Sequence, residues 1–129
     1  MTETAIAFFA KSDLALRAAR TLLDAGESEG CINRAYYAAY HAASAVLAEV
    51  GETLKTHKGT HNRFWVRFVE TGYIPREVAD VLSYGWRMRE KADYDVFSVF
   101  DITAAANLVD DVEAFVRTTK QLVRHVGNG

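Results

Sequence analysis

Residues 33–50 have the sequence NRAYYAAYHAASAVLAEV, in which alanines are interspersed with three tyrosines and almost no charged residue occurs. At 3.6 residues per turn, this segment forms a helix with two different faces. The apolar face comprises Ile32, Tyr36, Ala39, Ala43, Val46, Leu47 and Val50, and the aromatic-polar face comprises Asn33, Arg34, Tyr37, His41 and Ser44. A helix with so little charge is normally covered on both faces. We therefore predict that it is the central helix of a bundle.

The composition indicates one globular domain spanning residues 1–129, because half of the residues are hydrophobic and a quarter are charged. A net charge of -2 gives no overall attraction to nucleic acid or to an acidic membrane. The single cysteine, Cys31, excludes an internal disulfide and fits a reducing compartment. No segment approaches the roughly 18 apolar residues of a membrane span, and the N-terminus lacks a signal-peptide pattern. We expect a cytoplasmic protein without membrane contact.

The rest of the sequence also favours helices. It contains a single proline, and it has no segments of alternating β-branched residues that would indicate strands. The first helix is expected over residues 4–25, with a kink near Ser12 as an alternative. After a loop over residues 52–60, Thr60 is the expected N-cap of a short third helix. The fourth runs from Pro75 to about Tyr94, and the fifth begins near Asp101 or Thr103. The predicted fold class is all-α, an antiparallel bundle of four long helices plus one short helix.

Arg89 is the least expected residue of the predicted fourth helix, because it lies near the middle of that helix's apolar stripe. The stripe comprises Val78, Val81, Leu82, Gly85 and Ala92. A buried arginine needs a partner for its charge, and Asp93, one turn further on, is the nearest acid. An Arg89–Asp93 pair that fixes helix register is one interpretation. The other is an arginine that projects into a cleft to bind phosphate with its bidentate fork.

Two further groups of residues carry candidate chemistry. Arg34, Tyr37 and His41 share one face of the central helix, so they either pack beneath a neighbouring helix or supply a charge and a proton-transfer group. The segment KTHKGTH, residues 55–61, lies in a stretch with four basic residues and no acid up to Arg67. Lys55, His57 and Lys58 are its candidate contacts to a phosphate backbone, although most such segments are solvated loops.

A metal site or cofactor is not expected from this sequence. His57 and His61 are four residues apart, but neither a cysteine nor a carboxylate accompanies them at ligand spacing. Cys31 has no histidine partner in the sequence and is interpreted as core packing.

Together, three segments resemble a small bacterial and archaeal branch of the HEPN domain superfamily. They are NRAYYAAYHAASAVL, then KTHKGTHNRFWVRF, then RMREKADY. The resemblance covers essentially the whole chain and implies an all-helical bundle that forms a homodimer, with Arg89 of each copy near a shared cleft. It also implies a toxin-like ribonuclease encoded beside a minimal nucleotidyltransferase that acts as its antitoxin.

The active motif of that superfamily is an arginine followed four to six residues later by a histidine, on the helix that corresponds to the fourth one here. Arg89 matches the arginine, but Tyr94 occupies the histidine position. A tyrosine with a pKa near 10 is poorly matched to moving a proton near neutral pH. Arg34 and His41 reproduce the spacing on a different helix, and spacing alone does not transfer the role.

Three functions therefore remain open. The preferred one is a nucleotide- or RNA-binding component of a toxin–antitoxin-like system with a nucleotidyltransferase-type partner. The first alternative is a metal-independent endoribonuclease that uses Arg89 with Tyr94, or with His41 brought close in space. The second alternative is a structural dimer without a ligand, in which the Arg89–Asp93 pair fixes the register of the helices.

Overall fold

The computed structural model describes residues 1–127, so the last two residues of the predicted domain lie outside the described part. The all-α prediction is confirmed, and the four long helices predicted from the sequence are present. They are α1 (Glu3–Asp24), α2 (Ser28–Glu49), α5 (Val81–Tyr94) and α6 (Ile102–Gly127). The shorter elements are α3 (His57–Phe64), the π-helical segment η1 (Trp65–Val69) and α4 (Arg76–Ala79). Within residues 1–127, no helix has the length and apolarity needed to span a membrane.

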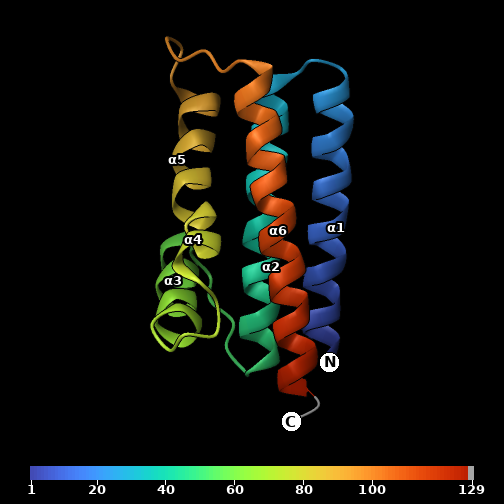
Figure 1. The fold of residues 1–129 in the computed structure, drawn as a ribbon, viewed down its shortest axis with the longest axis vertical. Coiled ribbons are helices and arrows are strands. Elements are labelled where there is room, and N and C mark those ends of the chain that lie inside the picture. Colours follow the sequence, from blue (N-terminus) through green and yellow to red (C-terminus); the bar gives the residue numbers. More distant parts are fainter. Residues whose placement is uncertain (128–129) are drawn as a thin grey trace.

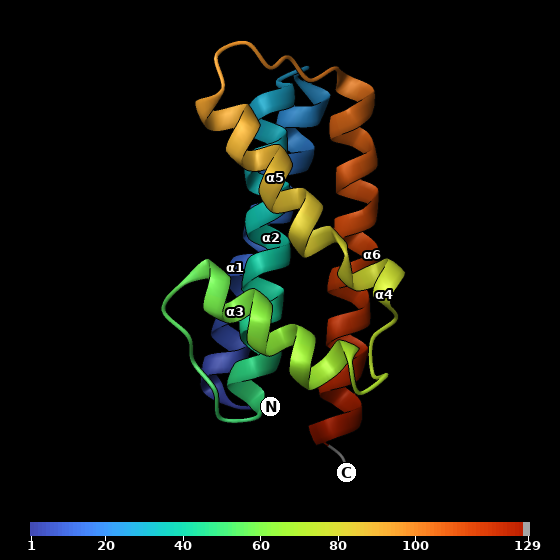
Figure 2. The ribbon, with the colours of Figure 1, turned by 90° about the vertical axis from the view of Figure 1, so that its left-hand side faces the viewer.

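The long helices α1, α2 and α6 lie side by side, while α5 and α3 follow one another along the same side of α2 (Figures 1 and 2). Helix α2 packs against α1, α3, α5 and α6, which confirms that it is the central helix. Its alanines and its apolar face are buried, and the tyrosine of that face, Tyr36, is 0% exposed. The aromatic-polar face is only partly covered, because Tyr37 and His41 are half-buried.

Helix α1 is continuous, and the alternative of a kink near Ser12 is wrong. Ser12 is fully buried, and its hydroxyl donates a hydrogen bond to the carbonyl oxygen of Ala38 at 2.7 Å. Because the partner lies on α2, the serine side chain does not compete with the backbone bonds of its own helix. The hydroxyl thus joins α1 to α2 at a point where the two backbones approach closely.

The predicted start of the third helix is wrong by one turn. Thr56, rather than Thr60, is the N-cap, and its side-chain oxygen accepts the N–H of Gly59 at 2.9 Å. Threonine is a good N-cap at either position, and Thr60 is instead buried inside the helix. His57 and His61 therefore occupy successive turns of one helix, on the same face.

The predicted fourth helix is divided in two. Pro75 precedes α4, a single turn that ends at Ala79, and α5 begins after Asp80. Helix α5 then runs across α2 with Gly85 at the contact, where Tyr36 and Leu108 meet its backbone. This close approach places the C-terminal half of α5, with Arg89 and Asp93, beside the aromatic-polar face of α2.

Candidate functional site

The guanidinium of Arg89 lies among three aromatic rings. Its central carbon is 5.4 Å from the ring centre of Tyr37, 5.1 Å from that of Trp86 and 5.5 Å from that of Tyr94. The side chain is only 11% exposed, although it carries a charge. Contacts of a cation with aromatic faces stabilise it by about 0.5–2 kcal/mol each, more when water is excluded. The rings therefore hold Arg89 in place without using its hydrogen-bond donors.

Asp93 binds the inner edge of this guanidinium. Its Oδ2 atom is 3.0 Å from Nε of Arg89, so the ion pair predicted from the sequence forms. The same oxygen accepts a hydrogen bond from Nδ2 of Asn33 at 2.9 Å, and Oδ1 of Asn33 accepts one from Nε of Arg34 at 2.9 Å. The guanidinium of Arg34 also lies 5.0 Å from the ring centre of Tyr37. A continuous polar chain thus links two arginines, one on α2 and one on α5.

The two terminal nitrogens of Arg89 make no hydrogen bond to any residue in the described chain, and they are not among its fully buried polar atoms. Only Glu90 comes near, with an oxygen 3.8 Å from Nη1. Burial of the guanidinium disfavours its charge, but Tyr37, Asp93, Tyr94 and Glu90 outweigh this and raise the pKa of Arg89 above its usual value. Arg89 is therefore a cation held in a fixed position, with its two terminal nitrogens available to bind a ligand.

Two histidines of α3 meet at one tyrosine of α2. The hydroxyl oxygen of Tyr36 is 2.8 Å from Nδ1 of His57 and 2.8 Å from Nε2 of His61. The ring of His57 stacks on Tyr40, with centres 4.1 Å apart, and lies 4.8 Å from the ring of Trp86. His57 also contacts the ring of Tyr37, so the rings of Tyr37 and Trp86 each contact both His57 of α3 and Arg89 of α5.

Tyr36, His57 and His61 are neutral near pH 7. Burial lowers the pKa of His61 to about 4, with a smaller effect from His57. Burial, followed by the positive charge of Arg89, also lowers the pKa of His57, and Glu90 opposes this in part. Burial raises the pKa of the Tyr36 hydroxyl far above its usual value, and the neighbouring tyrosines add to this. The ring nitrogens that contact Tyr36 are occupied by it, so they are not offered to a metal ion.

His41 occupies a different environment. Its ring is 6.4 Å from that of Phe8 on α1 and 6.1 Å from that of Tyr37, and its Nδ1 atom is buried without a partner. Burial lowers the pKa of His41 to about 4, and the positive charges of Lys11 and Arg34 act in the same direction. This environment favours the interpretation that His41 packs beneath a neighbouring helix over the interpretation that it transfers protons.

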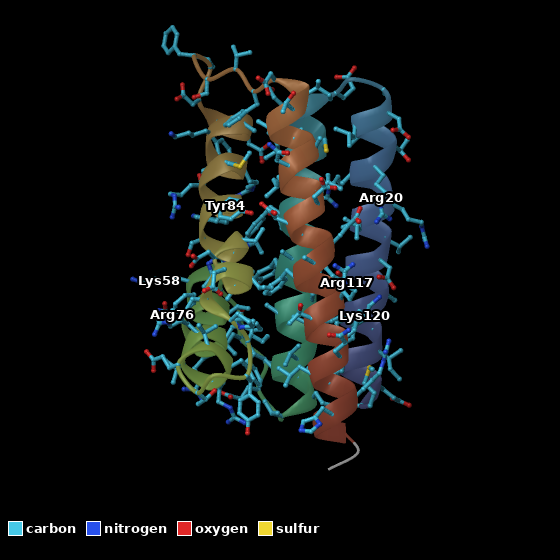
Figure 3. The ribbon with its side chains drawn as sticks, viewed as in Figure 1. Arg20, Lys58, Arg76, Tyr84, Arg117 and Lys120 are labelled. Carbon is cyan, nitrogen blue, oxygen red and sulfur yellow. The ribbon has the colours of Figure 1, made fainter. Side chains whose placement is uncertain are left out.

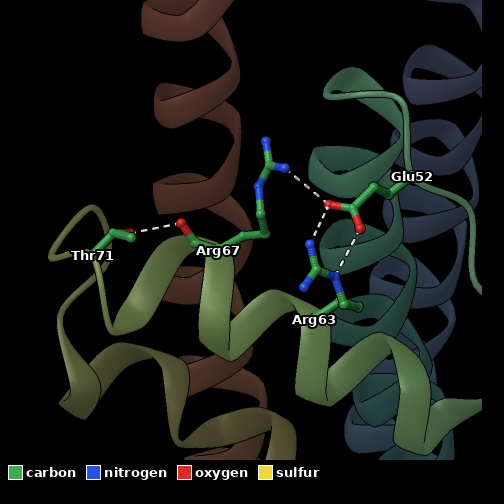
Figure 4. A network of polar contacts seen from close by, with 4 residues as sticks. All are labelled: Glu52, Arg63, Arg67 and Thr71. Atoms are coloured by element: carbon green, nitrogen blue, oxygen red, sulfur yellow. Dashed lines mark hydrogen bonds and ion pairs between the residues drawn. The ribbon is translucent and has the colours of Figure 1, made fainter.

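The basic segment is less basic than its sequence indicates. Glu52 accepts two hydrogen bonds from Arg63, at 2.7 and 3.1 Å, and lies 3.2 Å from Nη1 of Arg67 (Figure 4). Two of the four positive charges are therefore paired with one acid that precedes the segment, which lowers the local net charge by one. Lys55 and Lys58 are exposed, and Lys58 projects away from the bundle (Figure 3). Of the predicted contacts in this segment, only His57 reaches the Arg89 cluster.

Tyr94 is 69% exposed and still contacts Arg89 through its ring. The segment that follows is also open, with Val96, Phe97 and Val99 between 88% and 91% exposed. Cys31 is fully buried, and burial raises the pKa of its thiol, in agreement with a packing role. No group of three or more His, Cys, Asp or Glu side chains that could hold a metal ion occurs within the described residues.

The model of the HEPN domain family matches residues 7–122 of this chain. A UPF0332 protein of Archaeoglobus fulgidus is 32% identical over 113 residues, which cover 88% of this chain and 90% of the relative. A protein of Methanocaldococcus jannaschii named "Putative toxin MJ0605" is 29% identical over 111 residues, covering 86% of this chain and 82% of the relative. A UPF0332 protein of Thermotoga maritima is 26% identical over 105 residues, covering 81% and 80%.

Proposed function

This chain belongs to the HEPN domain family, and from that premise we propose that it is a toxin-like protein that binds single-stranded RNA, or a nucleotide, at Arg89. The proposal rests on the contacts that the guanidinium of Arg89 makes and on those that it lacks. Aromatic rings and Asp93 hold it in place, yet both terminal nitrogens lack a protein acceptor. A planar fork presented in this way matches two oxygens of one phosphate.

The surrounding rings suit the rest of a nucleotide. Tyr94 is largely exposed beside Arg89, and stacking of a base on an aromatic ring contributes about 1–3 kcal/mol in single-stranded nucleic acid complexes. Arg34, which also contacts the ring of Tyr37, supplies a second positive charge. Because the net charge of the chain is -2, attraction to RNA has to come from this local cluster.

The cellular setting is part of the same proposal. We expect a homodimer and a nucleotidyltransferase-type antitoxin as partner, as the resemblance implies, while the name "Putative toxin" of the archaeal relative supports only the toxin-like setting. Light scattering at tens of micromolar tests the first expectation, since a mass near the 14.4 kDa of one chain would contradict it. Co-purification with the product of a neighbouring gene tests the second.

Cleavage of the bound RNA is the second candidate function, and one observation favours it. The sequence places Tyr94 where the active motif has histidine, whereas the fold places His57 of α3 against Trp86 and Tyr37, the two rings that also contact Arg89. A neutral imidazole beside a phosphate-binding arginine is suited to general acid–base chemistry near neutral pH. The absence of histidine from α5 therefore does not exclude a ribonuclease.

Fluorescence anisotropy with a labelled single-stranded RNA tests the binding proposal. Arg89→Ala should weaken binding at least tenfold, because it removes the only guanidinium held among the three rings. The matched control is Arg87→Ala, which removes an exposed arginine two residues away on the same helix and should change little. His41→Ala should also have a small effect. The logarithm of the affinity should fall with that of the salt concentration, with a slope of about 0.7 per neutralised phosphate.

Equal effects of Arg87→Ala and Arg89→Ala would mean that only general charge attracts RNA, and the Arg89 site would be rejected. Competition by a mononucleotide distinguishes the two kinds of ligand. If it displaces the RNA at similar concentrations, one phosphate and one base account for binding. If it does not, a longer strand is the ligand.

A further inference from the structure

The hydrogen bonds of Tyr36 restrict the protons of two histidines at once. A tyrosine hydroxyl carries one proton, so it donates to one acceptor and accepts from other donors. Both ring nitrogens lie 2.8 Å from the oxygen, and both imidazoles are neutral near pH 7. The buried hydroxyl has no other acceptor among the described residues, and leaving its proton unpaired would be costly, so one histidine accepts the O–H of Tyr36 while the other donates its N–H to it. The two tautomers are coupled.

Two arrangements satisfy this condition. In the first, Tyr36 donates to His61, and Nδ1–H of His57 donates to Tyr36, which leaves Nε2 of His57 as a free acceptor. In the second, all donors are reversed and Nε2 of His57 carries a proton. In the first arrangement His57 can take a proton at Nε2 while its Nδ1–H goes on donating to Tyr36, so no hydrogen bond changes direction. In the second arrangement Nε2 already carries a proton and cannot accept another.

His61 is suited to the accepting end. It is more strongly desolvated than His57, and burial lowers its pKa to about 4, so it resists becoming a cation. Nε2 of His57, in contrast, has no protein partner in residues 1–127 and is not among the fully buried polar atoms. It is therefore open to a ligand. The charged and titratable groups that face His57 are Tyr36, Tyr37, Tyr40 and His41 of α2, His61 of α3, and Arg89 and Glu90 of α5.

We propose that His57 is the catalytic proton-transfer residue of a ribonuclease site at Arg89, and that Tyr36 and His61 are positioning residues that fix its tautomer. This inference rests on the proposed binding of RNA at Arg89. The substrate class is single-stranded RNA, because the reaction needs a 2′-hydroxyl next to the phosphate that Arg89 binds.

The step balances without a co-reactant other than water. Nε2 of His57 accepts the proton of the 2′-hydroxyl, and the 2′-oxygen forms a bond to the adjacent phosphorus. The bond from phosphorus to the 5′-oxygen of the next nucleotide breaks, and that oxygen takes a proton from water. The products are a 2′,3′-cyclic phosphate and a 5′-hydroxyl end, and the hydroxide formed from water removes the proton from His57. Arg89 stabilises the charge on the phosphate oxygens.

The main experiment measures binding and cleavage of the same labelled RNA by the full chain, in the presence of a chelator. His57→Ala should keep RNA affinity within a fewfold of wild type but reduce the cleavage rate by about 100-fold or more, the range of a general base. The wild-type rate should rise with pH and level off below the usual histidine pKa of 6.5, because the pKa of His57 is lowered. Arg89→Ala should lose binding and cleavage together.

The positioning role has its own readouts. Tyr36→Phe removes only the bridging oxygen and should cost on the order of 10–100-fold in rate, as orienting hydrogen bonds do. His61→Gln, which retains a polar group facing Tyr36, should restore more activity than His61→Ala. Tyr84→Phe is the matched control, since it deletes a tyrosine hydroxyl that donates to Asp111 between α5 and α6 and lies outside the cluster (Figure 3). Nitrogen NMR of the histidine rings should show one fixed tautomer of His57 that becomes mixed in Tyr36→Phe.

The outcomes separate the two proposals. RNA that binds through Arg89 without being cleaved, or that is cleaved equally well by His57→Ala, overturns the catalytic assignment and leaves the binding proposal intact. No RNA binding by the wild type overturns the proposed function and with it the substrate of His57. A mixed tautomer of His57 in the wild-type protein rejects the positioning role whatever the RNA result.

Discussion

The two faces of α2 differ in the size and polarity of their side chains. On the side where Ser12 of α1 bonds to Ala38, beside the packing of His41 on Phe8, α2 carries a stripe of small, fully buried side chains: Cys31, Ala35, Ala38, Ala42 and Ala45. The buried side chains of α1 include four small ones: Ala5, Ser12, Ala15 and Ala19. Toward α3 and α5, α2 presents Tyr36, Tyr37 and Tyr40, whose rings contact histidine, tryptophan and arginine. We refer to these as the alanine face and the tyrosine face.

The difference shows how one helix supports both stability and chemistry. Small side chains let two backbones approach closely, so the alanine face can place α1 and α2 rigidly but offers no reactive group apart from the buried thiol of Cys31. Large rings fill the space between α2 and the helices α3 and α5, and they bring polar atoms that need partners. The tyrosine face should therefore respond to pH and to loss of charge, and the alanine face to added volume.

Acid should produce the largest effect, and it should act through histidines. The pKa of His41 and that of His61 are each about 4 in the folded chain, against the usual 6.5. Between pH 6.5 and about 4 the unfolded chain binds more protons, so the free energy of unfolding falls as the pH is lowered. Each histidine contributes about 1.4 kcal/mol per pH unit in that window. Urea unfolding at pH 7, 6 and 5 measures the slope.

His61→Gln should remove the share of one histidine from that slope, and so should His41→Gln, while His57, whose pKa is also lowered, continues to contribute. Ser12→Ala, on the alanine face, lowers stability through a lost hydrogen bond but should leave the slope unchanged. Stability that stays constant from pH 7 to pH 5 would show that neither histidine is held neutral by burial.

Added volume on the alanine face should be the next largest effect. Ala42→Leu inserts three carbons where α1 and α2 pack most extensively, and it should lower the free energy of unfolding by about 1–3 kcal/mol or more. Ala10→Leu makes the same change at an exposed position of α1 and should lie within about 0.5 kcal/mol of wild type. Equal effects of the two variants in chemical denaturation would mean that the alanine face is not tightly packed.

Removing a charge from the tyrosine face should have a smaller effect. Asp93→Ala removes the ion-pair partner of Arg89 and the hydrogen-bond acceptor of Asn33, and we expect a loss of about 1–2 kcal/mol. Arg89→Met should be tolerated better, since Asp93 is 24% exposed and keeps its bond to Asn33. Glu90→Ala is the control, because its contact with Arg89 is longer, at 3.8 Å, and 42% of its side chain is exposed. If thermal unfolding shows that Glu90→Ala destabilises the protein more than Asp93→Ala does, the Arg89–Asp93 pairing is contradicted.

The two faces also differ in how far the sequence predicts them. The helical period of residues 33–50 predicts α2 and its burial, and the spacing of Arg89 and Asp93 predicts their ion pair, because both depend on local geometry. The sequence does not predict the histidine cluster, because the helical period places Tyr36 on the apolar face and Thr60 is a plausible N-cap that would leave His57 outside the helix. A signal was present, however. A tyrosine buried in a core needs a partner for its hydroxyl, and His57 and His61 are spaced one helical turn apart. Which helix supplies that partner depends on tertiary packing, which spacing does not reveal.

The smallest effect should be a gain in stability, and it concerns the residue that sets the distance between α5 and the tyrosine face. A Cβ atom on Gly85 would lie 3.5 Å from Cδ1 of Tyr36 and 3.6 Å from Cδ1 of Leu108, which is ordinary contact. Gly85→Ala should therefore raise the free energy of unfolding by about 0.5–1 kcal/mol, the difference in helix propensity. Gly85→Val adds branched carbons against the same two side chains and should be destabilising instead.

Gly72→Ala is the opposite control: its φ of +86° disfavours any side chain, so the same substitution should lower stability by about 1 kcal/mol although space is available. Loss of stability in Gly85→Ala would mean that α5 lies closer to Tyr36 than ordinary contact allows. RNA binding by Gly85→Ala would then be expected to weaken as well, because Arg89 lies one turn further along the same helix.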